Sequence, residues 1–186
     1  MNRERKPAFE PVEYHLDGDD RIGWVNDAWR FFADANGAPL ETREPLGRPL
    51  WDFVTNPETR HLYGAMFAKA RRTGRPITVE FRCDAPTCRR AMALTMTRRG
   101  PTGLALRVET LHLEPREPVR LLDVTLGRDA RMLRMCGWCK KVALADDRWV
   151  EVEDAVAELG LFHAPSLPGI THGICPACVA RVEAIA

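Results

Sequence analysis

Ile77-Thr78-Val79-Glu80-Phe81-Arg82-Cys83 is the segment whose pattern specifies the class of fold. Its apolar side chains alternate with polar ones, which is the period of a β-strand with one buried face and one solvated face. The same alternation returns over residues 92–96 and 104–108, and the turn-forming residues 99–103 separate these two stretches. The three stretches predict an antiparallel sheet whose apolar face needs a cover.

Two helices predicted upstream supply that cover. Residues 21–25 are expected to form a short strand, after which Asn26 can cap a helix that runs over residues 28–35. Asn56-Pro57 is a typical start for a longer helix with an apolar face, and Gly74 is a typical end. Residues 1–11 are polar and contain two prolines, so we expect a flexible leader there.

Two closely spaced cysteine pairs mark the C-terminal part of the chain. Cys136-Gly137-Trp138-Cys139 and Cys175-Pro176-Ala177-Cys178 each place two residues between the thiols. One tight turn can then direct two sulfurs at one ion, and two such turns complete the tetrahedron that zinc prefers. The sequence therefore predicts a Zn²⁺ site with four ligands: Cys136, Cys139, Cys175 and Cys178.

Other chemistry remains open for these cysteines. Iron or an iron–sulfur cluster uses the same four ligands. Each pair also resembles a dithiol redox site, although a βαβ pattern around it is absent. His172 lies three residues before Cys175, and we expect it to act as a hydrogen-bond donor beside the metal ligands.

Composition limits the function classes. The chain has 186 residues, of which 45% are hydrophobic, and a formal net charge of +1, so bulk electrostatics do not favour nucleic acid as a partner. It has neither an apolar run long enough to span a membrane nor a signal peptide, which predicts a cytoplasmic protein. Phosphate-binding loops, nucleophile elbows and HExxH motifs are absent, so no enzymatic activity is expected.

Residues 12–113 resemble a PAS domain. The resemblance rests on Ile22-Gly23-Trp24-Val25-Asn26-Asp27-Ala28, on Leu46-Gly47-Arg48-Pro49-Leu50, and on the passage from residues 72–74 into the strand at residues 77–80. It implies a sensory or interaction domain that is often a homodimer and sometimes holds a small-molecule ligand between helices and sheet. The candidates for lining such a cavity are Phe81, Met92, Leu94, Met96, Leu106 and Val108.

Residues 136–178 resemble a small cysteine module appended to bacterial PAS and two-component signalling proteins, and the module is predicted to span residues 136–186. The matching stretches are residues 136–141, 149–153 and 171–178. With residues 114–135 as a linker, the chain is predicted to have an α+β fold: a PAS-like antiparallel sheet covered by helices on one face, plus a zinc-ribbon-like module. The expected function is non-enzymatic signalling through a ligand or an unknown protein partner. The alternatives are a redox- or metal-responsive sensor and a nucleic-acid-associated zinc-ribbon protein.

Overall fold

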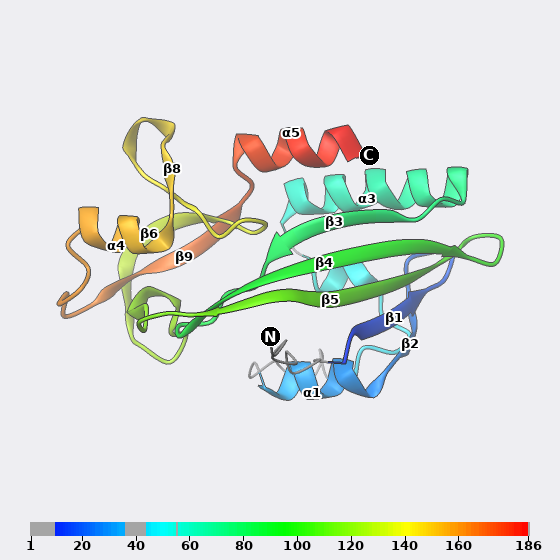
Figure 1. Ribbon diagram of the computed structural model, residues 1–186, viewed down its shortest axis with the longest axis horizontal. Coiled ribbons are helices and arrows are strands. Elements are labelled where there is room, and N and C mark those ends of the chain that lie inside the picture. Colours follow the sequence, from blue (N-terminus) through cyan, green and yellow to red (C-terminus); the bar gives the residue numbers. More distant parts are fainter. Residues whose placement is uncertain (1–9, 36–43, 55, 186) are drawn as a thin grey trace, which may run out of the picture.

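Two sheets organise the chain (Figure 1), of which the computed structural model describes residues 10–35, 44–54 and 56–185. The first sheet is antiparallel throughout, with the strand order β2-β1-β5-β4-β3. Its strands and helices are β1 (Val12–Leu16), β2 (Ile22–Val25), α1 (Asp27–Ala35), the 3-10 turn η1 (Leu50–Asp52), α3 (Pro57–Thr73), β3 (Ile77–Arg82), β4 (Cys88–Arg99) and β5 (Gly103–Pro115).

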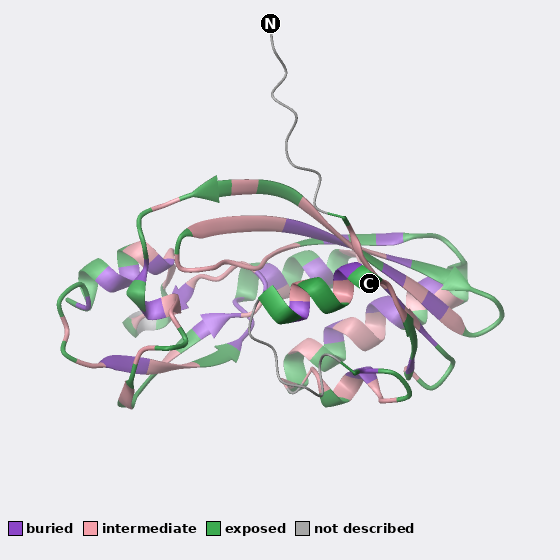
Figure 2. Ribbon diagram, turned by 90° about the horizontal axis from the view of Figure 1, so that it is seen from below, coloured by how far each residue is buried: buried purple, intermediate pink, exposed green. Residues whose placement is uncertain are grey.

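The predicted alternation decides which face of this sheet is buried. Met96 pairs with Ile77 on one side and with Leu106 on the other, so apolar side chains form continuous rows across the strands. Helix α3 packs Met66 and Phe67 against these rows, while Trp29 of α1 contacts Tyr14 of β1 edge to face. Both helices therefore cover the same face (Figure 2), which confirms the α+β architecture expected from the sequence.

The helix ends lie where the capping residues predict them. The Asn56 side chain accepts a hydrogen bond from the backbone N–H of Thr59 (2.8 Å), and Gly74 ends α3 in the left-handed conformation (φ 67°). The Asn26 side chain accepts a hydrogen bond from the backbone N–H of Trp29 (3.1 Å) at the start of α1. Residues 1–9 of the predicted leader lie outside the described residues.

The second sheet has the order β8-β7-β6-β9, with β6 and β9 parallel and the other neighbours antiparallel. Its elements are η2 (Arg120–Leu122), β6 (Arg128–Cys136), β7 (Val142–Ala143), η3 (Ala145–Asp147), β8 (Trp149–Val150), α4 (Val152–Glu158), β9 (Leu167–Gly173) and α5 (Pro176–Ile185). The described helices include none with the length and apolar character needed to cross a bilayer.

Two of these strands differ from the sequence prediction. Most of β6 lies in the predicted linker 114–135, and β9 forms at Leu167–Gly173, for which the sequence predicted no strand. The linker also buries Val119 and Leu121 in a hydrophobic cluster with Val152 of α4. Charged residues interrupt β6, so its local pattern does not indicate a strand, and its pairing with β9 joins residues far apart in the chain. The division at residues 113 and 136 remains a prediction.

Gly103, at the start of β5, allows a close approach between backbones. A β-carbon there would lie 2.8 Å from the Leu16 carbonyl oxygen and 2.9 Å from that of Arg99. We expect Gly103→Ala to lower the free energy of unfolding by about 1–3 kcal/mol, because neither backbone group can move without loss of strand pairing. Urea unfolding monitored by circular dichroism measures this change.

Gly64 provides the matched control for that substitution. It lies within α3, and a β-carbon there would have no neighbour within 4 Å. Gly64→Ala should raise the free energy of unfolding by about 0.5–1 kcal/mol, because alanine is the better helix former. Equal effects of the two substitutions would contradict the steric argument at Gly103.

Candidate metal centre

The structure brings the four paired cysteines together. Their sulfur atoms all lie within 4.8 Å of one another, and the Cys139 and Cys175 sulfurs are 3.7 Å apart. A zinc ion with Zn–S bonds of about 2.3 Å sets its sulfurs about 3.8 Å apart in a tetrahedron. The four cysteines are therefore close enough to hold one metal ion. They supply all four ligands of a tetrahedral site.

Each pair owes its geometry to a local turn. After β6, the backbone N–H of Lys140 donates to the Cys136 carbonyl (3.0 Å), and Lys140 itself adopts a left-handed conformation (φ 63°). The second pair lies at the start of α5, where the N–H of Cys178 donates to the Cys175 carbonyl (3.0 Å) and Pro176 is the first helical residue. The two turns thus direct two sulfurs each into one space.

The pKa values of these thiols favour the binding of a cation. The hydrogen bond from the Cys139 thiol lowers the pKa of Cys136 to about 4, and the same hydrogen bond raises the pKa of Cys139 far above its ordinary value. Burial raises the pKa of Cys178 to about 12. A divalent cation would supply the positive charge that stabilises thiolates at Cys139 and Cys178.

Basic groups beside the sulfurs come from two places. The Arg181 guanidinium lies 3.7 Å from the Cys178 sulfur, and the Lys140 ammonium donates to the Gly137 carbonyl (3.0 Å). Arg181 was not among the site residues predicted from the sequence. Its position three residues after Cys178 was the available signal, because residues at that spacing lie on one face where the chain is helical.

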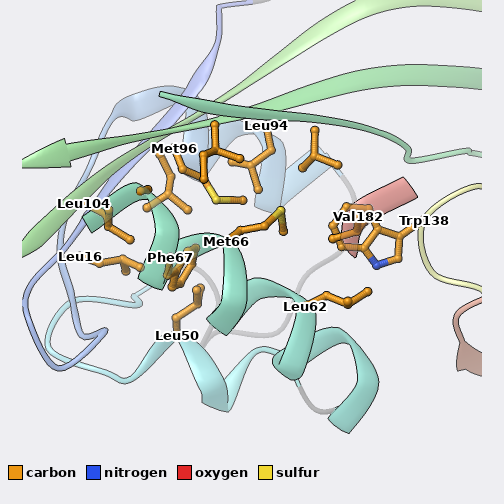
Figure 3. Packing of buried hydrophobic residues seen from close by; sticks show 14 of the residues in the cluster. Leu16, Leu50, Leu62, Met66, Phe67, Leu94, Met96, Leu104, Trp138 and Val182 are labelled. Atoms are coloured by element: carbon orange, nitrogen blue, oxygen red, sulfur yellow. The ribbon is translucent and has the colours of Figure 1, made fainter. Parts of the chain in front are cut away.

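The cysteine cluster packs against α3, the helix that covers the first sheet. The Trp138 ring lies 5.7 Å from the Tyr63 ring, and the Trp138 carbonyl accepts a hydrogen bond from the N–H of Arg82 on β3 (2.7 Å). Figure 3 shows Trp138 together with Val182 of α5 beyond Leu62, continuing the row of core side chains along α3. Cys136, Cys175 and Cys178 are buried in this same hydrophobic cluster.

Hydrogen bonds add to this junction. The Glu58 carboxylate at the start of α3 accepts from the backbone N–H of Ile174 (3.1 Å), directly before the second cysteine pair. Lys69, near the other end of α3, donates to the Ile185 carbonyl at the end of α5 (2.7 Å). Arg181 also reaches the Glu80 carbonyl of β3 (3.1 Å). Helix α5 is therefore held to α3 and β3 along its length.

A second junction consists of ion pairs. Asp84, whose side chain is fully buried, pairs with Arg82 and Arg116. These arginines also pair with Glu151 (2.6 Å) and Glu153 (2.8 Å) at the start of α4, and Arg89 of β4 pairs with Glu153 (3.0 Å). This network was not predicted from the sequence, because its members are spread along the chain in different elements.

The other predicted site residues are not gathered at the cysteines. His172 lies in β9 with its side chain exposed, and its carbonyl accepts a hydrogen bond from the Asn56 amide (3.1 Å). Its predicted role beside the metal remains a prediction. The six candidate cavity residues all lie in the first sheet: Leu94, Met96 and Leu106 are buried in the packed core, Phe81 packs against it, and Met92 and Val108 line a cavity beneath α1.

No protein-family model and no curated protein matches the chain. Among solved structures, it is similar to a domain of an HTR-like protein from Haloarcula marismortui ATCC 43049, with 17% identity over 55% of this chain and 98% of that chain, at a TM-score of 0.35. It is also similar to the Aer2 receptor from Vibrio cholerae, described as a dual PAS-heme oxygen sensor, with 13% identity over 55% and 96% of the chains, at a TM-score of 0.38. We draw no functional conclusion from likenesses of this size.

Proposed function

We propose that this chain is a non-enzymatic bacterial signalling protein, and that a structural zinc ion bound by Cys136, Cys139, Cys175 and Cys178 joins its sensory sheet to its C-terminal part. The observation that carries the proposal is the position of the sulfur cluster, which packs against the N-terminal end of α3. A change in the sheet domain can then reach the C-terminal surface through α3 and α5. Output would pass through a protein partner or through a second copy bound at the sheet domain, in the cytoplasm.

A structural ion fits this arrangement better than a catalytic one. The four sulfurs leave no open coordination position for water or substrate. Zinc also has no redox chemistry of its own, and it accepts four thiolates without a further geometric demand. The alternative of a redox sensor requires the thiols to be reached by an oxidant, whereas three of the four cysteines are buried.

Elemental analysis of protein purified without chelator tests the metal. We expect about one equivalent of zinc, lost in Cys136→Ser and Cys178→Ser because each removes one of four ligands. Cys83→Ser provides the control, since Cys83 lies outside the cluster. Iron with visible absorption, or metal far below one equivalent with all thiols titratable, would contradict a structural zinc site.

Peroxide treatment separates the structural role from redox sensing. A structural site is expected to keep its zinc at peroxide concentrations that oxidise a free thiol, because bound and buried thiolates react slowly. The measurement is zinc release followed by a chromophoric chelator, with mass spectrometry of the cysteines. Rapid release together with a disulfide inside the cluster would favour the redox-responsive sensor instead.

A further inference from the structure

The cavity beneath α1 differs from the core that α3 fills. It measures about 460 Å³ and lies between α1 and the strands β1, β4 and β5. Where α3 covers the same sheet face, the side chains are fully packed. Met66, Leu94 and Met96 are at most 1% exposed there. The volume falls in the range of sites for small molecules. Its wall is mostly apolar, as in Val12, Ala28, Phe31, Met92, Val108 and Leu113.

The exposure of Phe31 also indicates that this cavity binds a ligand. The side chain lines the cavity but is 72% exposed, which makes it the most exposed aromatic residue in the part of the chain that the structure describes. An exposed aromatic ring beside an apolar hollow is a feature of binding surfaces rather than of a finished core. A ligand with an apolar body would cover the ring.

Arg90 gives the cavity a charge. Three neighbouring arginines, at positions 82, 89 and 116, are all in ion pairs with carboxylates. Arg90 points instead to the inner face of β4, lines the cavity and lies over the Phe32 ring of α1 at 5.4 Å. Within the described ranges it forms no ion pair. Its guanidinium is therefore available to a ligand carboxylate, a pairing that Arg favours through its planar donors.

Glu10 is the other charged residue of the lining. It is exposed, and it follows directly on the undescribed leader, whereas Arg90 is partly buried between β4 and α1. Water screens an exposed charge more strongly than a partly buried one. An anionic group would therefore gain free energy beside Arg90, with its apolar part directed along Met92 and Val108.

We infer that this cavity binds a small anionic amphiphile, a carboxylate with an aliphatic body, through Arg90 and the apolar wall under α1. The inference rests on the proposed sensory function, because it names the class of ligand that the sheet domain would sense. The two can fail separately, since ligand binding under α1 and zinc content at the cysteines are independent measurements.

Calorimetric titration of the full-length zinc-loaded protein tests the inference with three probes, decanoate being kept below its micellar concentration and decanol below its solubility limit. Decanoate should bind saturably, decanol should bind about 10-fold to 100-fold more weakly for lack of charge, and butyrate should not bind for lack of apolar contact. Arg90→Gln should reduce decanoate affinity to the level of decanol and leave decanol binding unchanged.

Two further variants complete the test. Arg30→Gln removes an equal charge from an exposed position of α1 that does not line the cavity, and it should leave decanoate binding unchanged. Thr110→Phe, which fills the cavity from β5, should abolish binding of both decanoate and decanol. Absence of saturable decanoate binding, or equal affinities for wild type and Arg90→Gln, would overturn the proposal.

Discussion

Stripping zinc from the purified protein is expected to unfold the first sheet together with the cysteine cluster. Sequence reasoning alone predicts a local effect, because the cysteines fall in a separate C-terminal segment. The structure changes this expectation, since three of the cysteines and Trp138 share one hydrophobic cluster with Leu62, Met66 and the sheet. Loss of the ion would open that cluster at the N-terminal end of α3.

Two free energies set the size of this effect. Structural zinc contributes roughly 10–16 kcal/mol of apparent binding free energy in small zinc-folded peptides. A whole domain unfolds with only about 5–15 kcal/mol. Chelation should therefore lower the Tm by more than ~20 °C or remove the cooperative transition altogether. Two-dimensional amide NMR before and after chelation follows Leu94 and Leu106 of the sheet separately from the Trp138 indole.

Serine substitutions distinguish the metal from general effects of thiol loss. Cys175→Ser should reproduce the effect of the chelator, whereas Cys83→Ser should change the free energy of unfolding by less than ~1 kcal/mol, because Cys83 is outside the cluster. If the amide resonances of the sheet stayed in place while that of Trp138 collapsed, the C-terminal part would be an independent appendage. The signal path proposed through α3 would then be wrong.

Asp84→Ala is expected to destabilise the protein strongly, although Asp84 lies outside the cysteine cluster. The Asp84 carboxylate is fully buried, and it compensates Arg82 and Arg116, which are 19% and 8% exposed. It also accepts a hydrogen bond from the N–H of Arg90 (3.3 Å). Removal of one partner from a buried ion pair leaves uncompensated charge and costs about 3–5 kcal/mol. Chemical denaturation at pH 7 measures the loss.

An exposed ion pair supplies the control for Asp84. Glu158 pairs with Arg148 at 2.6 Å, and both side chains are largely exposed. Glu158→Ala should leave the midpoint of unfolding almost unchanged, because water and salt screen such pairs. A similar small effect for Asp84→Ala would show that water reaches the Arg82–Asp84–Arg116 network, and that it does not fasten α4 to the first sheet.

The elements that can be predicted from the sequence alone are those whose signals are local. Strict alternation over residues 77–83 fixes the buried face of β3, and Asn56 with Gly74 fixes both ends of α3. The spacing of each cysteine pair likewise determines that its two sulfurs share one turn. In each case the residues that carry the information lie within one helical turn, one strand or one tight turn, so their interactions do not depend on the rest of the chain.

How these elements pack against one another depends on contacts between distant parts of the chain. The charged strand β6 exists because β9 pairs with it, and the two cysteine pairs form one cluster because that sheet brings their turns together. Arg90 and Arg89 are neighbours in sequence, yet β4 directs one into an apolar cavity and the other to Glu153. Such contacts join residues tens of positions apart, and their free energy comes from burial and charge pairing that no local pattern encodes.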